Sequence, residues 1–138
     1  MAEPFVHTLR VRYGECDPQG MVFNAHYLGF VDDTITELWR AAFGGYGKML
    51  DRGVDIVVAE ANLRFRDAAR FDEVVTIEAT VTHLGTTSLR TSYRFRRDGE
   101  LLLEASLRHV FVRLGTNEKA PIPDWARAGL APWTELAA

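Results

Sequence analysis

Residues 24–43 read NAHYLGFVDDTITELWRAAF, and their apolar side chains recur with the period of an α-helix. The apolar positions form one broad stripe: Tyr27, Val31, Ile35, Leu38 and Ala42, flanked by Phe30, Trp39 and Phe43. A stripe of this width predicts a helix of about five turns that is largely buried. Gly44 and Gly45 follow directly, and glycine readily adopts the left-handed conformation that ends a helix.

Five stretches around this helix alternate apolar and polar residues with the period of two that indicates a β-strand. They are Phe5–Tyr13, Val54–Phe65, Val75–Thr82, Leu89–Arg96 and Leu101–Leu114. The connections between the last three are short, which predicts an antiparallel meander. One long apolar helix must then cover the apolar face of the sheet, so the sequence predicts an α+β domain with two layers.

The last predicted strand is apolar on both faces near its end, where Val110 and Val112 oppose Phe111. A partner subunit that covers the outer face of the sheet would explain this pattern. Residues 121–130 predict a short terminal helix with Pro123 near its start.

Composition narrows the class of protein. The 138 residues are 47% hydrophobic, enough to bury one core, and we expect a single domain over 1–138. The net charge of −3 argues against nucleic acid as a partner, because a polyanion needs a basic surface. Cys16 is the only cysteine, so neither a disulfide within the chain nor a zinc–cysteine site is expected. No stretch resembles a signal peptide or a membrane span, so we expect a cytoplasmic protein with no membrane partner.

A turn between the first strand and the helix carries the strongest candidate for chemistry. Asp17, Pro18 and Gly20 occupy the first, second and fourth positions of DPQG, the composition of a type I turn. A carboxylate just before a helix faces backbone N–H groups, which can also hold the oxygen of an acyl carbonyl. Asp17 could then act as a nucleophile or as a general base. The alternative is that Asp17 only starts its turn, a common role for Asp.

The residues around this turn resemble the signature of the 4-hydroxybenzoyl-CoA thioesterase-like family of hotdog-fold proteins. The matching block is YGECDPQGMVFNAHY at 13–27, and further matches lie at 27–30, 64–73 and 119–123, so the resemblance covers nearly the whole chain. It implies a hotdog fold, in which a five-stranded antiparallel sheet wraps around one long helix. It also implies a dimer with a continuous sheet, often assembled into a tetramer, and a site at the subunit interface.

The same resemblance implies hydrolysis of an acyl-CoA thioester to the free acid and CoA, with Asp17 as the catalytic carboxylate. The backbone N–H at about Asn24 would polarise the thioester carbonyl. No metal is implied, and no cofactor beyond the coenzyme A of the substrate. Two alternatives stay open: a hydratase or dehydratase of acyl thioesters on the same fold, and a non-catalytic acyl-CoA-binding protein. The acyl group is also open, as is coenzyme A against acyl carrier protein.

Two departures from the family pattern bear on the mechanism. Short-chain acyl-CoA relatives carry His where this chain has Asn24 and Asn where it has His26, so we expect Asp17 to act without a paired imidazole. Aromatic-acyl relatives carry a basic cluster in the loop that matches residues 85–87. Its absence here argues against a phosphate clamp in that loop and against the hydroxybenzoyl substrate. His26 could still hydrogen-bond the acyl group or Asp17; the alternative is a packed or solvent-tipped residue.

Further residues are candidate contacts for the substrate. Those in the turn and the helix are Gly20, Val22, Phe23 and Tyr27, and those in the strands and the following loop are Glu60, Arg64, Arg66, Thr86, Thr87, Ser88 and Arg90. The arginines could bind the phosphates of CoA, since a guanidinium matches phosphate geometry; alternatively they cover a solvated sheet face. Glu60 interrupts an apolar run and could face the acyl cavity, or it could be exposed at the sheet edge.

Overall fold

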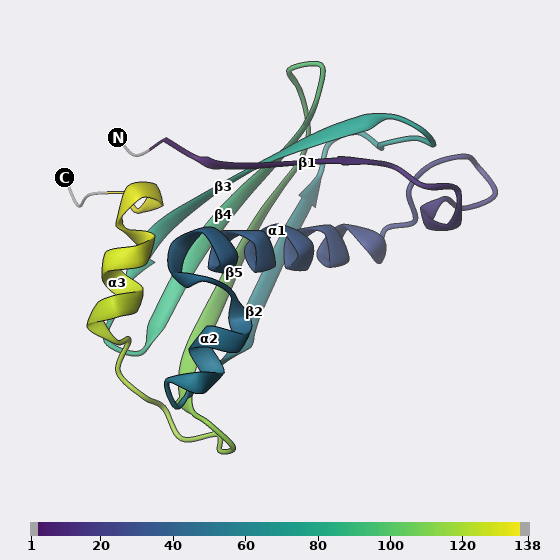
Figure 1. The fold of residues 1–138 in the computed structure, drawn as a ribbon. Helices are drawn as coiled ribbons and strands as arrows, with labels where there is room; N and C mark the ends of the chain where they lie inside the picture. The colour runs from purple at the N-terminus through teal and green to yellow at the C-terminus, as the bar shows by residue number, and fades with distance from the viewer. Residues whose placement is uncertain (1–2, 136–138) are drawn as a thin grey trace.

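The computed structural model describes residues 3–135 and shows a long helix lying across one face of an antiparallel sheet (Figure 1). The helix is α1 (His26–Phe43), inside the predicted range 24–43. The strands are β1 (Phe5–Arg10), β2 (Val54–Phe65), β3 (Val74–Leu84), β4 (Ser88–Arg97) and β5 (Glu100–Arg113), in the order β1-β3-β4-β5-β2. Two short helices, α2 (Tyr46–Asp51) and α3 (Asp124–Leu130), complete the fold. The predicted α+β class is confirmed.

The sheet and α1 share one hydrophobic core. Val31, Ile35 and Leu38 of α1 are buried against the inner face of the sheet. The inner residues of β3 and β4 recur at every second position, as their alternation predicted: Val75, Ile77, Ala79 and Val81, then Leu89, Thr91, Tyr93 and Phe95. Among residues 3–135, no helix combines the length and the apolar character needed to cross a membrane.

The end of α1 follows the sequence prediction. Gly44 is left-handed with φ of 91°, and its N–H donates to the Arg40 carbonyl at 3.1 Å. The Gly45 N–H donates to the Trp39 carbonyl at 3.2 Å, so the last turn of the helix is capped. The short helix α2, which begins at Tyr46, was not predicted, because the two preceding glycines read only as a stop.

The prediction of a first strand that reaches Tyr13 was too long. β1 ends at Arg10, and a single 3₁₀ turn spans Tyr13–Glu15. The Arg12 N–H donates to Glu15 Oε1 at 2.7 Å, which draws the chain away from the sheet. Tyr13 is therefore exposed and Glu15 is buried, although the alternation placed Tyr13 on the inner face.

The prediction that the end of β5 is buried on both faces is confirmed, but a partner subunit is not needed to explain that burial. Val110 and Val112 are 7% and 3% exposed within the single chain. The chain returns beside β5 after residue 114: the Ala120 N–H donates to the Phe111 carbonyl at 2.9 Å, and Val112 forms an isolated bridge with Lys119. This return segment continues the pairing beside β5 beyond Val110, where β4 begins at Ser88.

The outer strand β2 is the least covered part of the sheet. It pairs with β5 along one side only, with a bulge between Val58 and Glu60. Val57, Val58 and Phe65 are large apolar residues that remain exposed on it. An uncovered apolar edge strand is a surface that other proteins can pair with.

Candidate active site

The Asp17 loop (residues 16–24) leads into α1 as a tight hairpin. The Asp17 N–H donates to the Met21 carbonyl at 2.8 Å, and the Gly20 N–H donates to the Asp17 carbonyl at 2.9 Å. Gly20 has φ of 78°, a left-handed conformation that glycine adopts without a steric penalty. These bonds confirm the predicted turn and hold Asp17 in place ahead of the helix.

The carboxylate of Asp17 is oriented by the backbone of its own loop. Its Oδ1 accepts the N–H of Gln19 at 2.8 Å and the N–H of Met21 at 3.3 Å. Within residues 3–135, no hydrogen bond to Oδ2 is formed, and the side chain is only partly exposed. Asp17 therefore starts its turn, as one interpretation of the sequence held. The second carboxylate oxygen, Oδ2, remains available for catalysis, as the interpretation of Asp17 as a catalytic residue requires.

A cavity of about 490 Å³ opens beside this carboxylate, and we name it the Asp17 cleft. Two segments line it: Asp17, Gln19, Met21, Val22, Phe23, Asn24 and Tyr27 on one side, and Phe65, Arg66, Asp67 and Ala68 on the other. The structure thus brings together six of the predicted site residues, namely Asp17, Val22, Phe23, Asn24, Tyr27 and Arg66. Gly20 lies in the same loop but lines a neighbouring cavity with Asp17.

The chain enters α1 beside this cleft, which Asn24 and Tyr27 line. The His26 N–H donates to the Phe23 carbonyl at 2.9 Å, and the Tyr27 N–H approaches the Asn24 carbonyl at 3.4 Å. Within the part of the chain that the structure describes, the N–H groups of Asn24 and Ala25 donate to no protein acceptor, and no side chain caps the helix. Unpaired N–H groups at a helix start attract a negatively charged oxygen.

Tyr27 forms the floor of the cleft and is almost fully buried. Its hydroxyl accepts the Ala69 N–H at 3.0 Å, and its ring packs edge-on against Phe30 and Phe65. Burial raises the pKa of the phenol, although the Ala69 N–H opposes that shift. The hydroxyl therefore stays protonated at neutral pH and fixes the floor in position.

His26 lies in a different cavity from Asp17. This second cavity, the His26 groove, has a volume of about 580 Å³ and is lined by His7, Thr8, Leu9, Arg10, Arg12, Glu15, His26, Gly29, Phe30 and Asp33. In this groove His7 Nε2 and Asp33 Oδ2 are 2.8 Å apart. The His26 ring lies edge-on to Phe23, with centroids 6.3 Å apart. His26 is not among the residues that line the Asp17 cleft. That Asp17 acts without a paired imidazole stays a prediction.

Glu15 is also directed into the His26 groove rather than toward Asp17. Its Oε2 accepts a bond from the Arg12 guanidinium at 2.9 Å. Burial alone would raise the pKa of Glu15, but hydrogen bonds from the Arg12 side chain and N–H outweigh it, and the pKa is lowered. Asp17 is therefore the carboxylate that the turn presents to the cleft.

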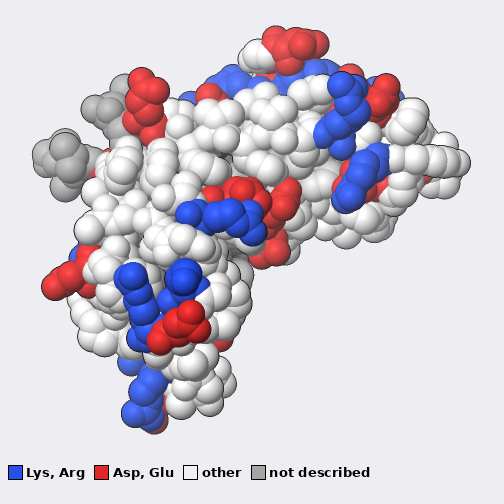
Figure 2. Space-filling view, in the orientation of Figure 1, with Lys and Arg blue, Asp and Glu red and all other residues white. Residues whose placement is uncertain are grey.

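The remaining candidates lie away from the Asp17 cleft in the single chain. Glu60 is exposed at the sheet edge and pairs with Arg90 at 3.2 Å, and Arg64 lines a shallow cavity on the outer sheet face. Thr86, Thr87 and Ser88 lie at the opposite end of β4 from the cleft, about 30 Å along the strand. Basic and acidic side chains are interspersed on the face shown in Figure 2.

Residues 66–68 are the part of the cleft that the sequence predicted least accurately. Arg66 was predicted as a phosphate ligand from its residue type. It lies at the mouth of the cleft because the chain bends after β2, which the sequence pattern does not indicate. Asp67 and Ala68 were not proposed at all. Among residues 3–135, no three His, Cys, Asp or Glu side chains converge where a metal ion could bind.

Comparison with known proteins identifies a matching protein family and related sequences. A family model of the thioesterase-like superfamily matches residues 11–130. The acyl-CoA thioester hydrolase YbgC of Escherichia coli is 29% identical over 105 residues, covering 75% of this chain and 78% of YbgC. The 1,4-dihydroxy-2-naphthoyl-CoA hydrolase of Synechococcus elongatus is 25% identical over 134 residues, covering 93% of each chain.

Solved structures share the fold. A thioesterase-superfamily protein from Jannaschia sp. superposes with a TM-score of 0.90 at 25% identity, covering 96% of this chain and 94% of that one. A protein from Aquifex aeolicus superposes with a TM-score of 0.87 and covers 92% of this chain. The hotdog fold, predicted from the resemblance, is confirmed.

Proposed function

We propose, because the chain belongs to the thioesterase-like superfamily and is a thioester hydrolase, that it cleaves acyl-CoA with Asp17 as the catalytic carboxylate. The observation that carries the proposal is the geometry of that carboxylate. Two backbone N–H groups hold Oδ1, and the Asp17 side chain lines the same cleft as the start of α1.

The chemistry follows from these two groups. Asp17 attacks the thioester carbonyl as a nucleophile, or it deprotonates the water that attacks. The N–H of Asn24, a residue that lines the cleft, would stabilise the negative charge that develops on the carbonyl oxygen. The departing thiolate needs no strong acid, so a site with a single carboxylate is sufficient.

The substrate needs cations for the phosphates of coenzyme A. Arg66 is the arginine at the mouth of the cleft, and we propose it as the first phosphate contact. Arg64 is next to Phe65 but lines a cavity on the outer face of the sheet, away from the cleft. Arg90, Glu60 and the residues from Thr86 to Ser88 lie farther along the sheet and do not line the cleft within one chain. We propose that they contact substrate only from a second copy of the chain.

A homodimer would complete the site in this way. β2 offers an uncovered apolar edge, and Phe65 belongs both to that edge and to the lining of the cleft. Pairing of two β2 strands would continue the sheet across the dimer and bring the second copy beside the Asp17 cleft. A tetramer would be a further assembly of such dimers.

Thiol release from a panel of short, long and aromatic acyl-CoAs tests the proposal. We expect at least one member to be hydrolysed, and Asp17→Asn to lower kcat by about 10² or more, as for loss of a catalytic base or nucleophile. Asp51→Asn, an exposed carboxylate on α2, is the matched control and should keep the wild-type rate. Turnover by Asp17→Asn within a few-fold of wild type would refute the role of Asp17. Binding without turnover across the panel would instead indicate an acyl-CoA-binding protein.

A further inference from the structure

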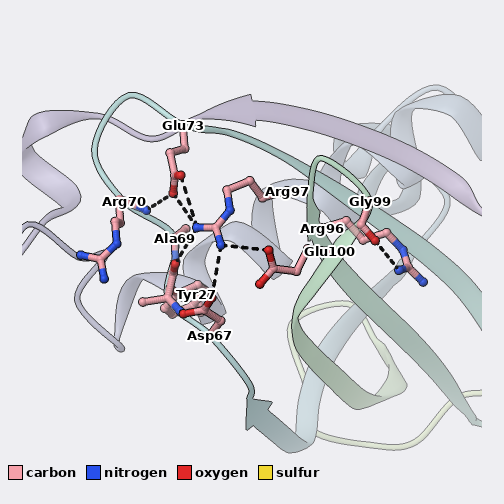
Figure 3. A network of polar contacts seen from close by, with 10 residues as sticks. Tyr27, Asp67, Ala69, Arg70, Glu73, Arg96, Arg97, Gly99 and Glu100 are labelled. Carbon is pink, nitrogen blue, oxygen red and sulfur yellow. Dashed lines mark hydrogen bonds and ion pairs between the residues drawn. The ribbon is translucent and has the colours of Figure 1, made fainter.

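Arg97, the last residue of β4, binds the segment that connects β2 to β3 (Figure 3). Its guanidinium donates to the Ala68 carbonyl at 3.1 Å, to Glu73 Oε1 at 2.9 Å and to Asp67 Oδ2 at 3.2 Å. Glu100 Oε2 is a fourth acceptor at 3.4 Å. The Arg97 side chain is only 17% exposed, so these bonds are formed largely out of solvent. One guanidinium therefore ties both ends of the segment 67–73 to the sheet.

The same segment holds the Asp17 loop from the other side. The Val22 N–H donates to the Ala69 carbonyl at 2.8 Å, and the Phe71 N–H donates to the Gly20 carbonyl at 3.4 Å. Ala69 also donates its N–H to the Tyr27 hydroxyl, as Figure 3 shows. The Asp17 loop thus pairs with residues 69–71. Arg97 binds the carbonyl of Ala68, the residue that precedes them.

A guanidinium suits this position for a geometric reason. It presents five N–H donors in a rigid plane, so it can bind a backbone carbonyl and several carboxylates at once. A lysine has a single rotatable ammonium on a flexible stem and cannot reproduce that set of directions. Hydrogen bonds between charged groups are also about twice as strong as neutral ones.

We propose that Arg97 is a positioning residue for thioester hydrolysis: it fixes the segment 67–73, which in turn fixes the Asp17 loop and the start of α1. This inference rests on the proposed function of Asp17. Arg97 does not line the cleft, so it acts through Ala68 and Ala69 and not on the substrate. A displacement of about 1 Å in a catalytic group can lower a rate by about 10², which is the physical basis of the proposal.

Arg97→Met and Arg96→Met form a matched pair for the test. Arg96 is the neighbouring residue, and its guanidinium pairs with Glu78 at 2.7 Å and with the Gly99 carbonyl, without a contact to the segment 67–73. We expect Arg97→Met to lower kcat by about tenfold or more while KM for the responding acyl-CoA changes less than about threefold. Arg96→Met should keep the wild-type kcat at a comparable loss in Tm. Arg97→Lys, which keeps the charge but not the fork, should recover only part of the lost kcat.

Hydrogen exchange of backbone amides gives a second readout that needs no turnover. The Val22 and Phe71 amides should exchange faster in Arg97→Met than in Arg96→Met, because the segment that they pair with is released. Unchanged exchange at these amides, or a kcat for Arg97→Met within twofold of that for Arg96→Met, would overturn the proposal. If Arg97→Met does not fold, Glu73→Gln removes one partner of the guanidinium and should give the same two effects at smaller size. Absence of turnover in the wild type would refute the proposed function, while the exchange experiment would still decide whether Arg97 holds the loop.

Discussion

At the scale of single residues, His109 departs from the rule that buried polar groups are paired. It lies on the inner face of β5 at 4% exposure, and its ring meets Trp39 edge-on with centroids 6.1 Å apart. Its Nδ1 has no hydrogen-bond partner within residues 3–135. Burial lowers the pKa of His109 to about 4, so the ring is neutral at pH 7.

This burial makes the stability of the protein depend on pH. An unfolded imidazole titrates near pH 6.5, whereas the folded one binds its proton only near pH 4. The stability that comes from keeping His109 neutral is therefore fully present above about pH 6.5. As the pH falls toward 4, the free energy of unfolding decreases by about 3 kcal/mol in total. His109→Gln should show a flatter decline of the free energy of unfolding across that window, measured by urea titration at several pH values. The exposed His83→Gln is the control and should keep the wild-type slope; parallel curves for all three proteins would contradict the prediction.

At the scale of elements, α3 packs against the end of α1 with almost no space between the two backbones. A Cβ on Gly129 would lie 2.4 Å from the carbonyl oxygen of Ala42 and 3.1 Å from its carbonyl carbon. Both neighbouring atoms belong to backbone and cannot move aside as a side chain could. The two helices can therefore meet in this way only with glycine at position 129.

Gly129→Ala should lower the free energy of unfolding by about 1–3 kcal/mol, the usual range for overpacking. Gly29→Ala is the matched substitution in α1, where an added Cβ meets nothing within 4 Å. It should raise the free energy of unfolding by about 0.5–1 kcal/mol through helix propensity. Urea unfolding of the two variants measures both effects, and a destabilisation of equal size in both would contradict the packing argument.

The elements themselves could be predicted because their patterns are local. The stripe at residues 24–43 and the alternation in β3 and β4 depend only on the period of each backbone conformation. The groove that His26 enters depends instead on the rotation of α1 after the turn. The clamp by Arg97 joins residues about thirty positions apart, which no local pattern records. Asp17 was singled out because residues 13–27 resemble a thioesterase signature; its turn alone fits equally an Asp that only starts a turn.

At the scale of the whole molecule, the sheet has two edges that differ in how their exposed apolar residues are arranged. β2 exposes three large apolar residues, Val57 and Val58 in its first half and Phe65 at its end, whereas β1 exposes Val6 between partly buried neighbours. The first edge leads directly into the Asp17 cleft through Phe65. We therefore expect self-association at β2 and not at β1.

Val58→Lys should dissociate the assembly and lower thioesterase activity, because a buried lysine at a strand pair is strongly unfavourable. Val6→Lys, of nearly equal exposure at 52% against 54%, is the matched control on β1 and should change neither property. Sedimentation velocity gives the molecular mass of each variant. A wild-type protein that sediments as a monomer, or a Val58→Lys variant that stays assembled, would contradict the expectation.

During synthesis, β2 leaves the ribosome well before the strand that pairs with it. Phe65 pairs with Leu103, and Val54 pairs with Arg113, so translation must add some tens of residues before β5 can cover β2. At about 5–20 residues per second, a nascent chain carries this apolar strand unpaired for several seconds. The strand order of the finished sheet thus sets a period in which the growing chain exposes an unpaired apolar strand, the kind of surface that promotes aggregation.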